Sequence, residues 1–393
     1  MTLSLKDLDV KGKRVLMRVD FNVPLNDDGS ISDDTRITLA LPSIQYVLQE
    51  GGKLILMSHF GRPKGKVCKE LSLKPCADRL SALLKKEVLL APDAIGKEVE
   101  VMAETLQEGA VMMLENLRFH PGEEDPEKDP SFAKSLAKLG DCYVDDAFGA
   151  AHRAHASTVT IASYFPGKCA MGFLMEKEIA ALSKLVLHPK HPFYAIIGGA
   201  KIKSKIGILR TLSEKVDALF IGGGMAFTFF KVLGVPIGDS ICDDERLKEA
   251  ETLLKRSKKT GMSLHLPLDV VITDGPEIKT VEIKEGIPKG WKGMDVGPAT
   301  IAAWSDILRK GTTIFWNGPV GVFEDPSFAK GTTYLAQNLS TMPGEVVVGG
   351  GDSIAAINQL HLQNAFAHLS SGGGASLEFI ENGTLPGIEA QTK

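Results

Sequence analysis

Short apolar stretches alternate with helical patterns along the chain, and this alternation is the strongest constraint on its fold. In the first half, the stretches that read as strands are Val15–Phe21, Leu54–His59, Val111–Glu115 and Cys142–Asp145. The helical patterns between them are Thr38–Glu50, Pro75–Lys86 and Ser131–Leu139. Strands that alternate with helices are typical of an α/β fold with a doubly wound, mainly parallel sheet.

The second half continues the pattern, and each of its strands ends in glycine or a polar residue. Its predicted strands are Phe193–Ile197, Ala218–Ile221, Asp269–Thr273, Thr313–Trp316 and Val346–Val348. Its predicted helices are Ser204–Leu212, Met225–Leu233, Glu245–Lys259, Thr300–Lys310 and Phe328–Asn338. We expect these strands to run in the same way as those of the first half, in a second α/β domain.

The chain has 393 residues, which is too long for a single hydrophobic core, so two domains of similar size are expected. We place the joint near Gly167–Phe173, ahead of a helical stretch at Leu174–Leu187 that can link the two cores. The predicted domains are therefore residues 1–170 and 174–382. The expected architecture is two α/β domains whose ligand-binding edges face each other.

Composition excludes several classes of partner. With 45 basic and 49 acidic residues the net charge is −4, which implies neither nucleic acid nor an anionic membrane as a partner. The charged residues within Met1–Lys13 are incompatible with a secretory signal. No apolar run approaches the roughly 18 residues needed to span a bilayer. Five scattered cysteines without a CxxC pair favour a reduced, cytoplasmic protein.

The segment Val346–Ser353, VVVGGGDS, has the pattern of a phosphate site. Three β-branched residues read as a buried strand, and Gly349–Gly351 form a turn in which backbone N–H groups can approach a ligand. Asp352 and Ser353 then lie where a helix is expected to begin and would cap it. A carboxylate beside phosphate requires a cation such as Mg²⁺, so the pattern indicates a magnesium nucleotide. An ordinary glycine-rich connection has the same pattern.

Polar side chains follow the predicted strands of the first half, at the edge where open α/β sheets bind ligands. Arginine is suited to phosphate because its planar group offers paired donors and remains charged. The residues at the strand ends are Asp20, Asn22, His59, Arg62, Asn116, Arg118, Asp145 and Asp146. The arginines that stand out in this half are Arg36, Arg62, Arg118 and Arg153. A lone arginine is usually a solvated surface residue, and the convergence of several at one edge is a hypothesis.

Histidines and paired acids give weaker signals. His59 follows a buried strand, so it is an acid–base candidate or a hydrogen-bonded structural histidine. His152 and His155 are three residues apart, but no third ligand at a suitable spacing accompanies them, which disfavours a metal site. Asp145 and Asp146 are adjacent on a strand and should point in opposite directions, which disfavours a shared acid–base dyad.

Neither standard nucleotide motif is present. Residues 198–205, GGAKIKSK, do not match GxxxxGK[ST], and GxGxxG is absent around Gly222–Gly224. Lys201 and Lys205 are four residues apart, so on a helix they would share one face and both reach phosphate; solvated lysines are the alternative. In WNGPVGVFE, the carboxylate of Glu324 is placed to accept hydrogen bonds from ribose hydroxyls, although a plain loop acid is the default.

Taken together, the motifs resemble the phosphoglycerate kinase family, from about Arg18 to the C-terminus. The matching segments, in order, are RVDFNVP (18–24), SHFGRP (58–63), ENLRF (115–119), DAFGAAHRAH (146–155), GGAKIKSKI (198–206), WNGPVGVFE (316–324), GGGDS (349–353), SGGGASLE (371–378) and LPGIEA. The family's fold implies two Rossmann-like doubly wound domains facing across a hinged cleft. It also implies that the tail, residues 383–393, returns to the N-terminal domain.

The resemblance implies two sets of binding residues. The set for 3-phosphoglycerate is Asp20, Phe21, Asn22, Arg36, His59, Phe60, Gly61, Arg62, Arg118 and Arg153. The set for ATP or ADP is Gly199, Ala200, Lys201, Lys205, Gly223, Gly224, Gly293, Asn317, Pro319, Val322, Glu324, Gly350, Gly351, Asp352 and Ser353. Asp352 would bind Mg²⁺. Arg36, Lys205, Gly350 and Gly351 would stabilise the phosphoryl group during in-line transfer, which requires no general base.

Two positions depart from the commoner family pattern. Ser353 replaces a frequent threonine and keeps the hydroxyl, and Asp145 stands where asparagine is common. The rival interpretations are a dinucleotide-dependent dehydrogenase, disfavoured by the missing GxGxxG, and a non-catalytic nucleotide-binding protein. The second rival predicts losses among Arg36, Lys205 and Asp352, but all three are present. We expect a monomer that binds small molecules only.

Overall fold

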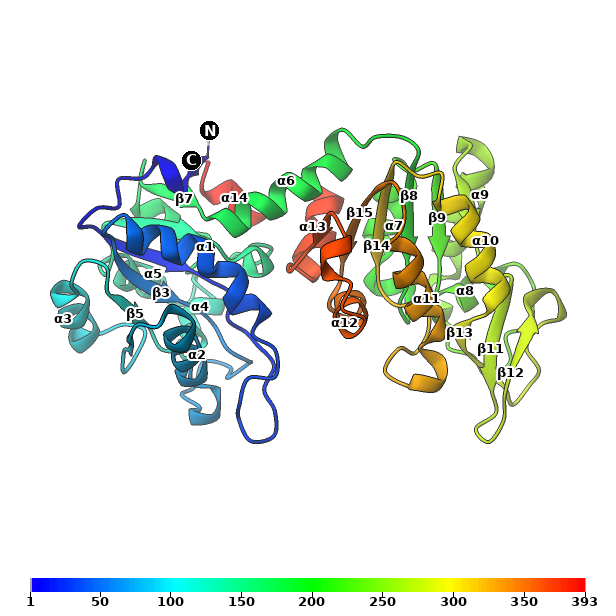
Figure 1. Ribbon diagram of the computed structural model, residues 1–393, viewed down its shortest axis with the longest axis horizontal. Helices are drawn as coiled ribbons and strands as arrows, with labels where there is room; N and C mark the ends of the chain where they lie inside the picture. The colour runs from blue at the N-terminus through cyan, green and yellow to red at the C-terminus, as the bar shows by residue number, and fades with distance from the viewer. Residues whose placement is uncertain (1, 393) are drawn as a thin grey trace. The chain divides into compact units, whose positions relative to one another are not determined.

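The structure is a computed structural model that describes residues 2–392. The chain divides into two compact units (Figure 1). Of the described residues, 2–180 and 384–392 form unit one, and Ala181–Gly383 form unit two. The division lies within the helix α6 (Phe173–Leu187) and not in segment 167–173, because that segment contains β7 (Cys169–Met171), which pairs with its neighbours in the sheet of unit one.

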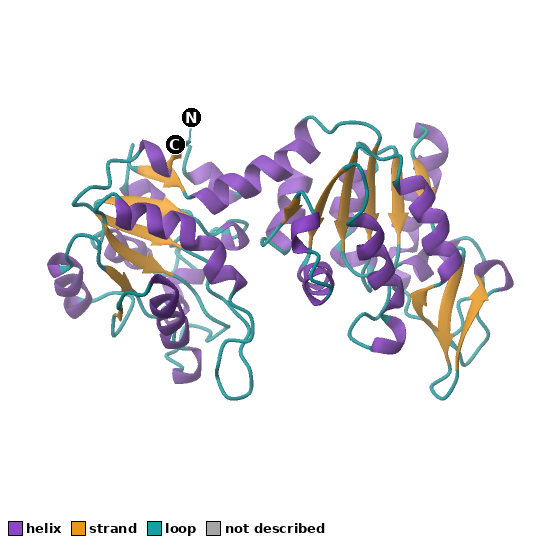
Figure 2. Ribbon diagram, viewed as in Figure 1, coloured by secondary structure: helices purple, strands orange, loops and turns teal. Residues whose placement is uncertain are grey.

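Unit one is built on a parallel sheet flanked by helices (Figure 2). Its seven strands have the order β1-β7-β6-β2-β3-β5-β4. The strands are β1 (Leu3–Ser4), β2 (Arg14–Arg18), β3 (Lys53–Met57), β4 (Val88–Leu90), β5 (Val111–Met113), β6 (Cys142–Asp145) and β7. The helices are α1 (Thr35–Gln49), α2 (Lys74–Leu84), α3 (Lys97–Thr105), α4 (Pro121–Glu124), α5 (Pro130–Ala137) and α14 (Pro386–Ala390), besides part of α6.

Alternate side chains of the central strands bury on opposite faces of this sheet, which gives unit one two apolar cores. Val15 and Met17 of β2 pack in a core with α1 and α2, whereas Leu16 packs in the other core with α3 and α5. The doubly wound arrangement is therefore confirmed. The sequence pattern missed β1, β4 and β7 because each has only two or three residues, too few for a periodic signal.

Unit two contains a six-stranded parallel sheet of order β10-β9-β8-β14-β15-β16. Its strands are β8 (Phe193–Ile197), β9 (Ala218–Ile221), β10 (Ser263–His265), β14 (Thr313–Asn317), β15 (Glu345–Gly349) and β16 (His368–Leu369). Its helices are α7 (Ile206–Leu212), α8 (Ala226–Val232), α9 (Leu247–Thr260), α10 (Pro298–Leu308), α11 (Lys330–Leu339), α12 (Gly351–Gln359) and α13 (Gly374–Asn382). The largest buried side chains of this unit, Trp304 and Trp316, lie in its core.

One predicted strand lies elsewhere. Asp269–Thr273 is β11, and it belongs to a separate antiparallel sheet with β12 (Ile278–Glu282) and β13 (Lys292–Val296). Our expectation that this strand continues the main sheet was wrong. The Asp274-Gly275 pair after β11 is a typical hairpin turn signal, and it directs the chain back antiparallel to β11.

The C-terminal tail lies in unit one. The backbone N–H of Gly387 donates to the carbonyl of Ala151 over 2.9 Å. The amide nitrogen of Gln391 lies 3.5 Å from an oxygen of Asp145, at the end of β6. The tail is thus anchored beside β6 and the segment that follows it.

Asp145 is fully buried at this anchor, and its surroundings favour the protonated form. Its Oδ1 accepts a hydrogen bond of 3.0 Å from the Ala147 N–H. Burial raises the pKa of Asp145 to about 7, although that hydrogen bond and Arg18 oppose the shift. An acid whose pKa is raised by folding destabilises the protein above its unfolded pKa, so stability falls as pH rises from about 4 toward 7.

We therefore expect Asp145→Asn to stabilise the chain at pH 8 by about 2–4 kcal/mol, and by much less at pH 4. Asparagine keeps an oxygen for the Ala147 N–H and removes the buried charge. Chemical unfolding at the two pH values measures the difference. If the free energy of unfolding rises equally at both pH values, or falls at pH 8, the buried charge of Asp145 is not the cause of the effect.

Candidate active site

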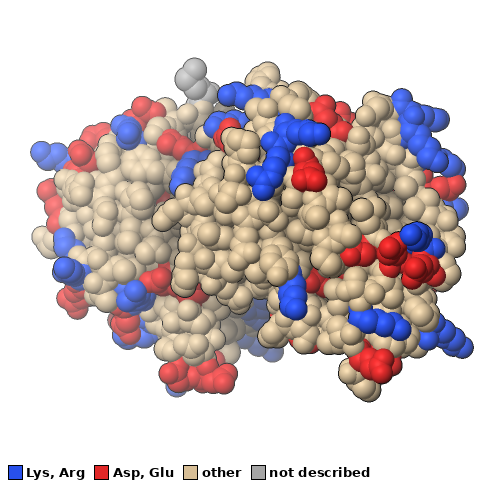
Figure 3. Space-filling view, turned by 45° about the vertical axis from the view of Figure 1, so that its right-hand side comes forward, with Lys and Arg blue, Asp and Glu red and all other residues tan. Residues whose placement is uncertain are grey.

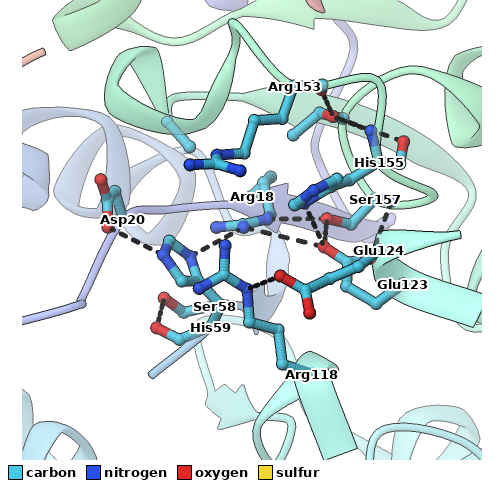
Figure 4. A network of polar contacts seen from close by, with 12 residues as sticks. Arg18, Asp20, Ser58, His59, Arg118, Glu123, Glu124, Arg153, His155 and Ser157 are labelled. Atoms are coloured by element: carbon cyan, nitrogen blue, oxygen red, sulfur yellow. Dashed lines mark hydrogen bonds and ion pairs between the residues drawn. The ribbon is translucent and has the colours of Figure 1, made fainter. Parts of the chain in front are cut away.

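The carboxyl ends of β2 and β3 bring Asp20 and His59 together in unit one (Figure 4). An Asp20 oxygen lies 4.0 Å from His59 Nε2, and its other oxygen forms an ion pair with Arg36. Arg36 reaches this position from the first turn of α1. Three of the predicted substrate residues thus form one contiguous group.

The loop after β3 is fixed by amide side chains. Asn22 Oδ1 accepts from the Gly61 N–H over 2.9 Å, and Asn116 holds Phe60 through bonds of 3.1 and 2.7 Å to its backbone N–H and carbonyl. The rings of Phe21 and Phe60 are buried in the core. Of the predicted substrate residues, these two can therefore offer a ligand only backbone groups.

The remaining arginines differ in their surroundings. Arg118 is buried, donates to the Gly61 carbonyl over 2.8 Å and forms an ion pair of 3.1 Å with Glu124. Burial lowers the pKa of Arg118, and neighbouring Arg18 and Arg153 lower it further, so three guanidinium groups lie close together. Arg62 and Arg153 are exposed. The structure records no ion pair for these two among the described residues, which leaves their charges available.

Sequence reasoning gave no role to Arg18, although it lies at the centre of this cluster. It is the last residue of β2 and has no exposed surface. It contacts His59, Ser157 and Glu123 (Figure 4). An arginine inside a predicted buried strand was the available signal, because an arginine is rarely buried unless it is paired.

Asp145 and Asp146 do not form a dyad. Asp146 accepts from the backbone N–H groups of Leu174 and Met175, at the start of α6, over 2.9 and 3.1 Å, whereas Asp145 accepts from Ala147. Burial raises the pKa of Asp146 to about 6. Within residues 2–392 there is no group of three or more His, Cys, Asp or Glu side chains that could hold a metal ion.

In unit two, four neighbouring strands, β9, β8, β14 and β15, end in glycine-rich turns at one edge of the sheet. The turns are tied together: the N–H of Gly198 donates to the Asn317 carbonyl over 2.9 Å, and that of Met225 donates to the Gly199 carbonyl over 3.1 Å. A Cβ atom on Gly223 would lie 2.7 Å from the Gly199 nitrogen, so only glycine fits there. This edge consequently presents closely packed backbone.

Lys205 lies within this edge and donates to Asn317 Oδ1. Burial lowers the pKa of Lys205 to about 8, and only the negative charge of Asp352 opposes this shift. The Nδ2 group of Asn317 is buried without a hydrogen-bond partner. A partly desolvated ammonium group beside an unsatisfied amide donor is a site suited to an anion.

Two expectations for this edge were wrong: that Lys201 and Lys205 share one helical face, and that Asp352 and Ser353 cap α12. Lys201 is extended and exposed, and residues 202–204 form a 3₁₀ helix, so Lys201 and Lys205 do not share an α-helical face. Gly350, with a φ of 93°, is the N-cap of α12; Asp352 is in its first turn and makes no capping bond. The Ser353 hydroxyl accepts from the Gly318 N–H over 2.8 Å, which joins α12 to the turn after β14.

The other predicted nucleotide residues surround this edge. Glu324 and Asp352 line one groove of about 570 Å³ with Tyr334 and Lys330. The N–H of Val322 donates to the Met294 carbonyl over 2.9 Å, which fixes the loop that follows Pro319. The predicted ligand residues Ala200, Gly224 and Gly351 lie at the same edge.

Gly293 lies farther along, in β13, where a Cβ atom would lie 2.0 Å from the Phe227 ring. Its N–H donates to Ser240 Oγ over 2.8 Å. The structure thus attaches Gly293 to α8, the helix that follows Gly223 and Gly224, and not to the strand ends themselves. Its role in nucleotide binding stays a prediction.

Comparisons with known proteins agree with one another. The family model for phosphoglycerate kinase matches residues 5–383. The chain is 46% identical over 392 residues to the phosphoglycerate kinase of Pseudothermotoga lettingae, covering 99% of this chain and 98% of the relative. It is 48% identical over 396 residues to that of Moorella thermoacetica, covering 100% and 99%.

Solved structures give the same result. The phosphoglycerate kinase of Coxiella burnetii superposes with a TM-score of 0.88 at 38% identity, covering 100% of this chain and 99% of that one. The enzyme of Pyrococcus horikoshii superposes with a TM-score of 0.86 at 31% identity, covering 99% and 98%. The chain, from its strand-end arginines to its glycine-rich turns, belongs to the phosphoglycerate kinase family.

Proposed function

We propose that this chain transfers the acyl phosphate of 1,3-bisphosphoglycerate to ADP, giving ATP and 3-phosphoglycerate, and catalyses the reverse reaction. The main support for the proposal is that this member of the family has two different anion-binding sites, one in each unit. Unit one gathers Arg18, Arg118 and Arg153 beside the Asp20–Arg36 pair, and unit two gathers glycine turns around Lys205. The first suits a small phosphorylated acid, and the second suits a nucleotide phosphate chain.

The residues act mainly by positioning and by neutralising charge. Arg118 and Arg153, joined by Arg62, would bind the phosphate that stays on the substrate. Arg36 and Lys205 would stabilise the three oxygens of the phosphoryl group that moves, with backbone N–H groups at Gly350 and Gly351. The attacking oxygen is already a carboxylate or phosphate oxygen, so no base has to remove a proton.

The donor set of unit two fits a magnesium nucleotide. Asp352 is an exposed carboxylate near Lys205, and Asn317 Nδ2 is an unsatisfied donor. Magnesium is usually held by one or two carboxylates together with phosphate oxygens and water, so a single carboxylate is sufficient. When bound through Asp352, Mg²⁺ would offset the negative charge of the phosphates. Glu324 would bind the ribose hydroxyls.

The proposal extends to the state of the protein in the cell. Basic and acidic side chains are interspersed on the face drawn in Figure 3, which suits small-molecule substrates rather than nucleic acid. All five cysteines are free, which suits a reducing cytoplasm. In the described part of the chain, no helix has both the length and the apolar character to span a membrane. We propose that a monomer is sufficient for catalysis.

Transfer also requires that the two ligands approach and that water be excluded, so we propose a hinge-bending closure of the two units. The chain passes between units within α6 and again after Gly383, which ends α13 in the left-handed conformation with a φ of 78°. We expect small-angle scattering to show a smaller radius of gyration with both substrates than with either one. Identical profiles in all states would exclude closure.

The proposed reaction is tested by a coupled assay of the wild-type chain with 3-phosphoglycerate, ATP and Mg²⁺. The expected result is formation of ADP that depends on all three components. A chain that binds nucleotide but transfers nothing would instead be a nucleotide-binding protein. Oxidation or reduction of a dinucleotide without ATP would indicate the dehydrogenase alternative.

A further inference from the structure

A buried contact between Arg18 and His59 determines which nitrogen of the histidine carries the proton. Arg18 Nη2 lies 3.0 Å from His59 Nδ1, and both side chains are buried. A guanidinium group only donates hydrogen bonds and stays charged in proteins. His59 Nδ1 must therefore accept, and the proton of the ring lies on Nε2.

Arg18 itself is held on its other sides. Its Nε donates to Ser157 Oγ over 2.8 Å, and its Nη1 donates to the carbonyl of Val19. Glu123, which has no exposed surface, accepts from the Ser157 hydroxyl and from the Ser157 N–H over 2.7 and 3.1 Å. A Glu123 oxygen also lies 3.9 Å from Arg18 Nη2. The guanidinium group thus has one orientation, with its charge offset by a buried carboxylate.

The other charges around His59 also disfavour the imidazolium form. Burial lowers the pKa of His59 well below its usual range, Asp20 opposes the shift, and Arg18, Arg118 and Arg36 add to it. His155, on the far side of Arg18, lies 3.8 Å from Glu123. Burial lowers the pKa of His155 to about 3, and the charges of Arg18, Arg118 and Arg153 add to this shift. His155 is therefore neutral near pH 7 as well, and neither histidine adds a positive charge to the cluster.

His59 Nε2 points toward Asp20 but does not reach it. The distance of 4.0 Å between Nε2 and Asp20 Oδ1 is too long for a hydrogen bond. The Nε2–H group can therefore donate to an oxygen of a ligand bound beside the Asp20–Arg36 pair. Figure 4 shows the ring between Asp20 on one side and Arg18 on the other.

We propose that Arg18 is a positioning residue that holds His59 as a neutral imidazole with its proton on Nε2, and that Glu123 and Ser157 hold Arg18. In this form His59 donates a hydrogen bond to a carboxylate or hydroxyl oxygen of the bound acid. It is neither a proton donor for the reaction nor one of the site's positive charges. The identity of that acid rests on the proposed function, but the tautomer does not.

Nitrogen NMR of the full-length chain tests the tautomer directly. Two-bond ¹H–¹⁵N correlations distinguish a protonated from an unprotonated ring nitrogen, and the spectrum of His59→Gln identifies the His59 signals among those of nine histidines. We expect an unprotonated Nδ1, a protonated Nε2 and no titration from about pH 5.5 to about pH 8, a range that spans the usual histidine pKa. A proton on Nδ1, or a titration midpoint within that range, would overturn the proposal.

The role of Arg18 is tested with the double variant Arg18→Met, Glu123→Gln, which removes both buried charges together and avoids leaving one unpaired. We expect the pKa of His59 to rise toward the usual histidine range, so that its titration enters the measured pH window. We also expect the KM for 3-phosphoglycerate to rise about tenfold and become pH-dependent, since about one hydrogen bond is lost. The matched control is Arg79→Met, which removes an arginine whose partner Asp34 is at the surface. His59 signals and a KM that match those of the control would refute the role of Arg18.

The two proposals fail separately. If the wild-type chain transfers no phosphoryl group but His59 keeps a non-titrating Nε2–H, the proposed function fails and the positioning role stands. If the chain is active but His59 titrates near neutral pH, the proposed function stands and the positioning role of Arg18 fails. The wild-type spectrum decides the question even if the double variant does not fold.

Discussion

Lys205→Ala is expected to lower kcat by about 10²–10³-fold, the usual effect of removing one preorganised donor from a developing charge. The lysine is partly buried beside Asn317, where a charge interacts more strongly than in water. Steady-state kinetics in the coupled assay measure the loss. Lys203→Ala is the matched control, because Lys203 is an exposed lysine in the 3₁₀ helix that directly precedes Lys205 and should leave kcat within about twofold.

The same lysine gives a pH dependence. Burial lowers the pKa of Lys205 to about 8 in the free protein, so its positive charge is lost as pH rises through that value. We expect kcat/KM for the nucleotide to fall above about pH 8, because the neutral amine attracts phosphate less strongly. A wild-type profile that is flat to pH 10 would show that Lys205 does not act as the cation of this site.

Arg36→Ala is expected to reduce kcat by about 10²-fold or more, since in the proposed reaction Arg36 would stabilise the moving phosphoryl group. The change also frees Asp20, whose carboxylate then adds uncompensated negative charge near the substrate. Binding of 3-phosphoglycerate should therefore weaken as well. Lys74→Ala, which breaks an exposed ion pair with Asp78, is the control and should change neither quantity. Unaltered turnover in Arg36→Ala would remove this residue from the reaction.

The strands that carry the site were largely predictable from sequence. Residues 142–145, 193–197 and 218–221 form strands with the predicted bounds, because their apolar stretches are buried on both faces and end at glycine or aspartate. The strand at Asp269–Thr273 was predicted as a strand but assigned to the wrong sheet. Its sheet is set by a hairpin turn and not by its own residues.

The residue types of the candidate site and their positions at strand ends were predictable from the sequence, but their contacts with one another were not. Arginines and glycines at strand ends marked both edges, since a parallel sheet brings those ends together. The environment of Arg18 was not predictable, because Glu123 and Ser157 lie more than a hundred residues away and carry no motif of their own. The spacing of Lys201 and Lys205 was misleading, since a four-residue interval places two side chains on one face only within an α-helix.

In the proposed reaction, each unit binds one of the two reactants and turnover needs both. This arrangement is tested most directly by calorimetric titration of 3-phosphoglycerate and of ADP with Mg²⁺ into Arg36→Ala and Lys205→Ala. We expect Arg36→Ala to weaken binding of 3-phosphoglycerate but not of ADP, Lys205→Ala to do the opposite, and neither variant to turn over normally. Loss of both ligands in a folded single variant, or full turnover in either one, would contradict it.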